Sequence, residues 1–118
     1  MAKMPYMNIV NQTEQINMAV YNARAKIIKA LAHPSRLIIV DFLADGPRCV
    51  CEIRNIVGSD QSTVSKHLAV LKNAGILSDE KRGLQVYYKL HCPCVLKFIG
   101  CVEEVMQNEY NAMCEILK

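Results

Sequence analysis

The stretch Gln61–Ile76, which reads QSTVSKHLAVLKNAGI, constrains the fold most because it has the period of one amphipathic helix and clear signals at both ends. Its apolar positions at helical spacing are Val64, Leu68, Leu71 and Ile76. Asp60 or Ser62 is suited to cap the start of such a helix. Gly75 follows the last turn, where a left-handed residue is expected. The sequence therefore predicts a helix with well-defined ends here.

The opposite face of this helix is polar and basic. It carries Gln61, Ser62, Ser65, Lys66 and Lys72 and is nearly free of carboxylates. Because carboxylates repel phosphate, such a face suits a helix that enters a DNA groove. An ordinary amphipathic helix with a solvated face remains the alternative.

The segments on either side extend this pattern. A short helix predicted over Val50–Val57 is followed by a turn at Gly58–Asp60, which together with the next helix gives a helix-turn-helix. From Ile76 to Leu90 the period changes to two, and a turn at Arg82-Gly83 divides this run into a β-hairpin. Next to a helix-turn-helix, the hairpin is expected to act as a wing that touches DNA. A structural ribbon with solvated charges is the alternative.

Three further helices are predicted, over Gln12–Leu31, Ser35–Ala44 and Pro93–Leu117. Asn11 and Glu14 form a capping-box pattern before the first. The first and last of these helices carry long apolar stripes, for which four small helices and a hairpin supply too little cover. Both stripes are expected to be buried in a second protomer, with packing against their own core as the alternative.

These elements predict a mainly α fold with a small β-hairpin, a homodimeric winged helix-turn-helix. We expect residues 12–118 to form one DNA-binding and dimerisation domain, preceded by a flexible arm over residues 1–11. The length of 118 residues is typical of a single domain.

Composition excludes several classes of protein. No apolar run approaches the roughly 20 residues of a membrane span, and the N-terminus lacks a secretory signal, so a cytoplasmic protein without a membrane partner is expected. The net charge of +3 permits nucleic-acid binding without arguing for it. No Ser-His-Asp order, phosphate loop or nucleotide fingerprint is present, which predicts neither an enzyme nor an organic cofactor.

The chain contains six cysteines, and in a reducing compartment such thiols more often ligate metals or do redox work than form disulfides. Side chains two apart in a helix point to different faces, so Cys49 and Cys51 converge on one ion only if Cys49 lies outside the helix. Pro47 and Arg48 just before it make that reasonable. Thiolates select soft ions such as As(III), Cd(II), Pb(II), Zn(II) or Cu(I). Two partly buried apolar thiols are the alternative.

Cys92, Cys94 and Cys101 make a second cluster. Cys94 and Cys101 are seven residues apart, two turns along one helix face, and the three thiols are predicted to form a trigonal site. Core thiols at a dimer interface are the alternative.

Four segments resemble the ArsR/SmtB family of winged-helix repressors: LAHPSRLIIVDFLADG, RCVCEI, QSTVSKHLAVLKNAGIL and KRGLQVYYKL. The resemblance covers roughly residues 24–100. It implies a homodimer joined through its first and last helices, which binds operator DNA and is released when a metal or metalloid binds.

The CVC at residues 49–51 resembles the arsenic-sensing branch of that family and the related cadmium/lead-sensing branch. The arsenic-type motif continues to a third Cys where this chain has Arg54, and cadmium/lead-type proteins add cysteines on an N-terminal arm, where residues 1–48 here have none. Cys92 and Cys94 fall where the zinc-sensing branch carries its first two ligands on the last helix, but Val105 and Asn108 replace the other two.

The predicted DNA-binding residues lie on the groove helix and the wing: Gln61, Ser62, Thr63, Ser65, Lys66, His67, Lys81, Arg82 and Gln85. Lys66, Lys81 and Arg82 are expected to meet phosphate, whereas the short polar residues at the start of the helix are expected near bases. His67 either reaches DNA or bonds locally and couples this helix to the one before it.

The sequence thus predicts a repressor released from double-stranded DNA by a thiophilic inducer. Arsenite is favoured, with Cys49 and Cys51 as its primary ligands and Cys92, Cys94 and Cys101 as a second candidate site. The alternatives are a Cd(II)/Pb(II)-sensing repressor, a repressor that responds to thiol oxidation or persulfides, and a protein-interaction module that does not bind DNA.

Overall fold

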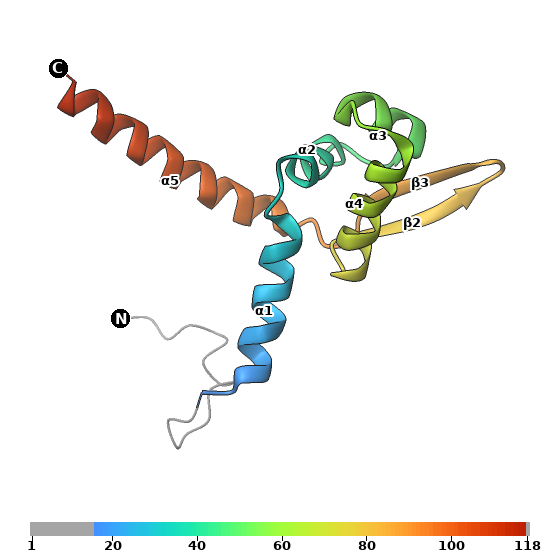
Figure 1. Cartoon of the computed structure of the whole chain (residues 1–118), viewed down its shortest axis with the longest axis horizontal. Coiled ribbons are helices and arrows are strands. Elements are labelled where there is room, and N and C mark those ends of the chain that lie inside the picture. The colour runs from blue at the N-terminus through green and yellow to red at the C-terminus, as the bar shows by residue number, and fades with distance from the viewer. Residues whose placement is uncertain (1–15, 118) are drawn as a thin grey trace.

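The computed structural model describes residues 16–117, which form five α-helices and one three-stranded antiparallel sheet (Figure 1). In chain order the elements are α1 Met18–Leu31, α2 Pro34–Phe42, β1 Arg48–Cys49, α3 Val50–Val57, α4 Gln61–Asn73, β2 Leu77–Arg82, β3 Gln85–Leu90 and α5 Val95–Ile116. The predicted mainly helical fold with a small β-hairpin is confirmed.

Capping residues set most of the helix ends. Helix α1 begins one residue after Asn17, whose side-chain oxygen accepts a hydrogen bond from the Ala19 N–H at 3.2 Å. The prediction of helix at residues 16 and 17 is therefore wrong. Asn17 is the N-cap and has an extended backbone, so the helix begins only after it. The capping box at Asn11 and Glu14 and the arm over residues 1–11 lie outside the described residues.

The helix-turn-helix lies where it was predicted. Helix α3 ends at Gly58, which has a φ of +74° that a residue with a Cβ rarely adopts. Asp60 then caps α4, and its carboxylate accepts the Thr63 N–H at 2.8 Å. The turn between the two helices is thereby fixed by one glycine and one cap.

The sheet has the order β1-β3-β2, with β3 in the centre. The hairpin is confirmed, but Arg82 pairs with Gln85, so its two-residue turn is Gly83-Leu84, one residue later than the predicted Arg82-Gly83. Strand β1 was not predicted, because two residues are too short to show a period. It pairs Cys49 with Tyr87 of β3, so the start of α3 is attached directly to the wing.

The core lies between the helices α2, α3 and α4 and the base of the sheet. Its fully buried members include Ile39, Val40, Ile53, Val64, Leu68 and Leu71. Burial of such a side chain stabilises the fold by about 2 kcal/mol. The buried face of α4 is therefore anchored, and its opposite face lies in solvent.

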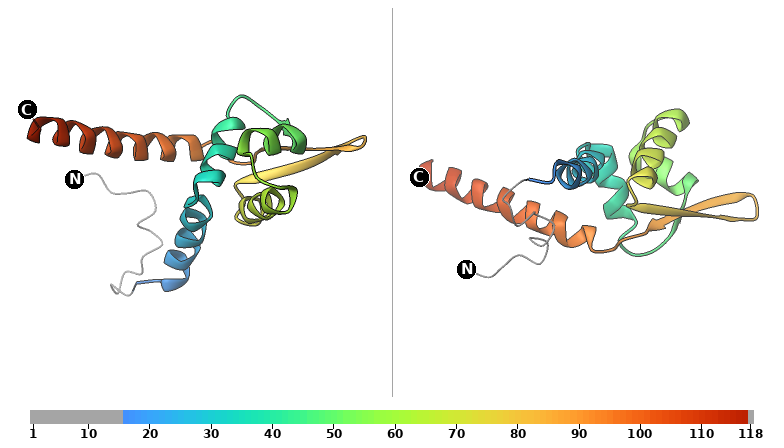
Figure 2. Two further views of the ribbon diagram at one scale, coloured as in Figure 1. Left: turned by 45° about the horizontal axis from the view of Figure 1, so that its top comes forward. Right: turned by 90° about the horizontal axis from the view of Figure 1, so that it is seen from below.

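Helices α1 and α5 project from this core in different directions, and the wing projects at the end of the molecule away from α5 (Figures 1 and 2). No residue of α5 is buried, although its apolar side chains continue to its last turn. Over the described residues, no helix combines the length and apolarity needed to cross a bilayer.

Candidate nucleic-acid interface and thiol pairs

Helix α4 has one buried and one exposed face. Val64, His67, Leu68 and Leu71 are buried. The exposed face carries Gln61, Ser62, Ser65, Lys66 and Ala69, with Thr63 half-buried at its border. This face bears no carboxylate, and together with α3 and the turn it has the form of a helix that reads DNA.

The leading end of α4 is organised by Asp60. Its carboxylate accepts the Thr63 N–H and, at 3.1 Å, the Ser62 hydroxyl. The bonds from Thr63, and then that from Ser62, hold the pKa of the Asp60 carboxyl below its usual range. Ser62 and Thr63 are thus oriented by the cap, whereas Gln61 and Ser65 extend from the exposed face.

His67 lies apart from the other predicted DNA contacts because it is buried against α2. Its ring packs on that of His33 with centroids 4.4 Å apart, and its Nδ1 lies 3.4 Å from Nη1 of Arg36. An arginine only donates, so His67 accepts there as a neutral ring. The helical period indicates this place, since position 67 is three after Val64 and four before Leu71. The predicted DNA contact by His67 does not fit its burial. His67 does bond locally, but its partners couple α4 to α2 and not, as predicted, to α3, the helix directly before it.

Lys81, Arg82 and Gln85 are exposed beside the turn of the wing. Figure 2 shows this turn projecting from the rest of the molecule. The Arg82 guanidinium lies over the ring of Tyr87, 4.7 Å from its centroid, and 3.5 Å from the Glu80 carboxylate. Leu84, in the turn beside these cations, is fully exposed and was not singled out from the sequence. The wing thus presents cations around an apolar tip.

Cys49 and Cys51 lie at the junction of the sheet and α3. Cys49 is the extended N-cap residue of the helix, so the condition for the two thiols to converge is met. Its N–H donates to Oε1 of Glu52 at 3.2 Å. This bond, more than the nearby Arg48, keeps the pKa of the Glu52 carboxyl low. Cys51 is exposed, and its thiol donates to Oε1 of Gln85 on the wing at 3.7 Å.

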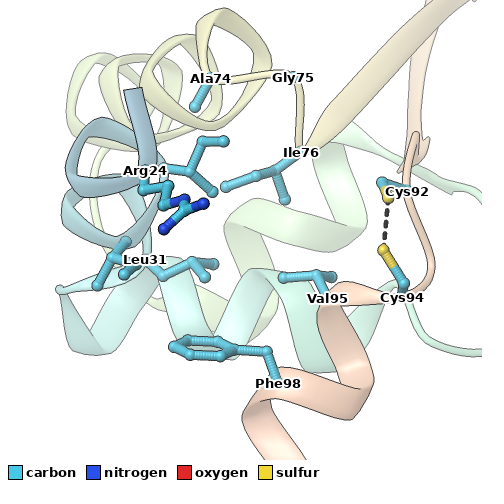
Figure 3. A pocket seen from close by; sticks show the side chains of 11 residues that line it. Arg24, Leu31, Ala74, Gly75, Ile76, Cys92, Cys94, Val95 and Phe98 are labelled. Carbon is cyan, nitrogen blue, oxygen red and sulfur yellow. Dashed lines mark hydrogen bonds between the residues drawn. The ribbon is translucent and has the colours of Figure 1, made fainter. Parts of the chain in front are cut away.

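The second cluster brings together two of its three predicted thiols. The sulfurs of Cys92 and Cys94 lie 2.7 Å apart (Figure 3). Their hydrogen bond raises the pKa of the Cys94 thiol. Cys101 does not join them, because seven residues of helix rise by about 10 Å. Among residues 16–117 no three His, Cys, Asp or Glu side chains are placed to hold one metal ion, so the predicted trigonal site is not formed.

The chain is similar to known regulators in sequence. Residues 33–79 match the family described as "Bacterial regulatory protein, arsR family". Over 89 residues the chain is 38% identical to an uncharacterized HTH-type transcriptional regulator of Methanocaldococcus jannaschii, which covers 75% of this chain and 100% of that protein.

Two resistance regulators match shorter stretches. A cadmium resistance transcriptional regulatory protein CadC homolog of Staphylococcus aureus is 45% identical over 67 residues, covering 56% of this chain and 55% of that one. The arsenic resistance transcriptional regulator ArsR1 of Pseudomonas putida is 41% identical over 66 residues, covering 55% and 52%. The chain spans about half the length of these two relatives.

The fold also matches a solved structure. The homodimeric winged helix-turn-helix DNA-binding domain of a Mycobacterium bovis protein superposes with a TM-score of 0.71 at 28% identity, and the match covers 95% of each chain. The predicted winged helix-turn-helix fold is confirmed.

Proposed function

Because this chain belongs to the ArsR family of bacterial regulatory proteins, we propose that it represses transcription until a thiophilic metal or metalloid releases it from DNA. It is a DNA-binding regulator and not an enzyme. The favoured inducer is arsenite, captured by Cys49 and Cys51, and Cd(II), Pb(II) and Zn(II) are the other soft ions that suit the two thiols.

One observation supports this proposal most. The CVC segment is part of both DNA-binding elements, since Cys49 pairs with Tyr87 in the wing sheet and the Cys51 thiol bonds to Gln85 of the same strand. The helix that begins between the two thiols leads through one turn into α4. An ion that draws both sulfurs to itself breaks the bond to Gln85 and shifts the wing relative to α4.

The relatives support a soft ion of this kind, since one is named for cadmium resistance and another for arsenic resistance. Arg54 cannot supply a third ligand, because a guanidinium has no lone pair to donate. We propose that a thiol or hydroxide from solution completes the coordination. By linkage, operator DNA must weaken inducer affinity by the same factor by which the inducer weakens DNA affinity.

On DNA, we propose that a homodimer places two α4 helices in successive major grooves of a pseudo-palindrome, with half-sites about one turn apart. Gln61, Ser62, Thr63 and Ser65 lie toward the bases in this arrangement. Lys66, Lys81 and Arg82 meet phosphate. Gln85 lies on the wing and accepts the hydrogen bond of the Cys51 thiol, so inducer binding at Cys51 changes its contacts. His67 acts from inside the fold, by holding α4 on α2.

The test is a titration of the DNA-bound protein with As(III), Cd(II), Pb(II) and Zn(II), followed by fluorescence anisotropy on DNA from upstream of its own coding region. The Cys49→Ser/Cys51→Ser variant should bind DNA as the wild type does and should not respond to arsenite. Cys114→Ser is the matched control and should respond normally. If the double variant is released normally while a Cys92→Ser/Cys94→Ser variant is not, sensing lies at α5 and this assignment is wrong.

A further inference from the structure

A cavity of about 260 Å³ lies where α1, the start of α2 and the end of α4 meet. Its lining includes three cations, which we call the α1–α4 cation cluster: Lys26, Lys29 and Arg36. None of the other residues that line it is acidic. The cavity therefore has three positive charges at its wall and no carboxylate to balance them.

The cluster also lacks a counter-ion from elsewhere in the described chain. Within residues 16–117, none of the three cations is ion-paired with a carboxylate. Nη2 of Arg36 donates to the carbonyl oxygen of Lys29, and Nη1 lies beside Nδ1 of His67, both at 3.4 Å. The Nε of Arg36 is buried without a hydrogen-bond partner. Three like charges around one space repel one another, so an anion placed there is attracted by all three.

The cavity lies beside the exposed face of α4, on the side away from the wing. Lys72 is ion-paired with Asp79 of β2, so the wing lies along that side of the helix. Val70 lines the cavity and is about 200° round the helix from Lys72. Figures 1 and 2 show the same arrangement, with α1 on one side of α4 and the wing on the other. Asn73, which also lines the cavity, is exposed and lies two turns after Lys66 on the face that would meet DNA.

The cluster does not lie on the face of α1 that is expected in the dimer. Ile28 is 52% exposed and belongs to the apolar side of α1. Lys26 is about 200° round the helix from Ile28, and Lys29 is about 100° from it. No residue of α5 lines the cavity. A dimer contact along the apolar sides of α1 and α5 therefore does not require these cations.

A helix in the major groove has a sugar-phosphate strand on each side, and the wing supplies Lys81 and Arg82 toward one of them. We propose that the α1–α4 cation cluster binds a phosphate of the other strand, so that α4 is held between two backbone contacts. A water molecule takes up about 30 Å³ in the liquid, so the cavity has room for a phosphate group with several of its waters. The inference rests on the proposed function, in which α4 enters the groove.

Such a contact fixes how α4 lies in the groove without selecting a base, because phosphates carry no sequence information. Arg36 connects the cavity to α4 through His67, so an anion at the cluster also supports the packing of α4 on α2. Loss of the contact is therefore expected to weaken binding to every DNA sequence alike.

The first test measures DNA affinity at several salt concentrations. Lys26→Ala/Lys29→Ala should lower the slope of log affinity against log salt by about one to two, because one or two phosphate contacts are lost. Lys26→Arg/Lys29→Arg keeps both charges and should keep the wild-type slope. Lys72→Ala/Lys97→Ala removes the same charge outside the cavity lining and is the matched control, with a slope nearly unchanged. An unchanged slope in the first variant, or an equal fall in the control, overturns the proposal.

The proposed function and this inference can fail separately. If Lys66→Ala lowers the slope and Lys26→Ala/Lys29→Ala does not, α4 meets DNA and only the inference is wrong. If the wild-type protein shows no salt-dependent affinity for DNA, the proposed function is wrong and the inference fails with it.

The second test locates the phosphate with duplexes in which single phosphates are replaced by neutral methylphosphonates. A phosphate bound by the cluster should matter to the wild type and to Lys81→Ala/Arg82→Ala, but no longer to Lys26→Ala/Lys29→Ala. It should lie across the groove from the phosphates to which the wing variant becomes insensitive. Insensitivity of both variants to the same phosphates overturns the proposal. If inorganic phosphate binds the cluster in free protein by calorimetry while neither DNA measurement changes, the cavity holds a free anion and the proposal is wrong.

Discussion

His67 is the buried polar residue of the described core, and its surroundings favour the uncharged ring. Burial lowers its pKa from the ordinary 6.5, and the neighbouring His33 and Arg36 lower it further. As the pH falls through 6.5, His67 of an unfolded chain takes up a proton, whereas His67 of the folded protein stays neutral until a lower pH. The folding free energy contributed at this site is therefore complete above about pH 6.5 and is lost as the pH falls toward the lowered native value.

We expect His67→Leu to flatten the pH dependence of stability between about pH 7 and pH 5. Urea denaturation of both proteins at several pH values measures this. On acidification, the urea concentration at the unfolding midpoint should fall less in the variant than in the wild type. Ser65→Ala, on the exposed face of the same helix, is the control and should follow the wild type. A variant profile parallel to the wild type would show that His67 does not cause the acid sensitivity.

At the level of single residues, the sequence predicted exposure better than contact. The helical period places Gln61, Ser65 and Lys66 on the exposed face of α4, where they lie. Contacts between distant residues, such as that of Cys51 with Gln85, depend on how the wing docks. Nothing in the local pattern of either segment specifies that contact.

Helix α4 presents two lysines in different settings. Lys66 lies in the exposed face that would meet DNA, whereas Lys72 is ion-paired with Asp79 at 3.0 Å near the other end. Hydrogen bonding and charge from Asp79 also raise the pKa of Lys72. The two positions therefore form a matched pair for separating a phosphate contact from a structural cation.

Lys66→Ala should weaken binding to all DNA sequences and lower the slope of log affinity against log salt by about one, because one phosphate contact is lost. Lys72→Ala should leave the slope nearly unchanged. The affinity of each variant, measured at several salt concentrations on two unrelated DNA duplexes, gives these slopes and shows whether the loss depends on sequence. A change in sequence preference alone would mean that Lys66 faces a base instead.

The elements that were predicted well are the helices whose ends are marked in the sequence by a capping residue or a glycine. Helix α3 was bounded by Gly58 and α4 by Asp60, and each has the predicted limit there. The start of α1 was placed too early, because Asn11 with Glu14 resembles a capping box while the cap observed is Asn17. Strand β1 forms only because β3 is beside it, and such a tertiary pairing leaves no local pattern.

In the molecule as a whole, the apolar surface is concentrated on the projecting helices. Val102, Val105, Met106, Tyr110 and Met113 are each between 44% and 65% exposed on α5. A monomer rarely exposes a contiguous apolar patch larger than a few hundred Å². This surface favours the proposed dimer through α1 and α5, in which two copies cover each other's stripes.

Val102→Glu or Met106→Glu should convert the dimer to monomer and abolish operator binding, since a buried unpaired charge opposes association. Sedimentation at micromolar concentration measures the first effect and anisotropy the second. Asn108→Glu, a polar position on the same helix, is the control for added charge and is predicted to remain dimeric. A wild-type protein that sediments as a monomer would contradict the proposed assembly.

Strand β2 lies at one edge of the described sheet, and the last four of its six residues are Asp79, Glu80, Lys81 and Arg82. An edge strand offers unpaired backbone groups to any passing strand, and charged side chains are a common protection against such pairing. A further copy that added a strand here would remove water from these charged side chains, which costs free energy. The same run that gives the wing its cations should therefore protect the protein from strand-to-strand aggregation when copies crowd on adjacent sites.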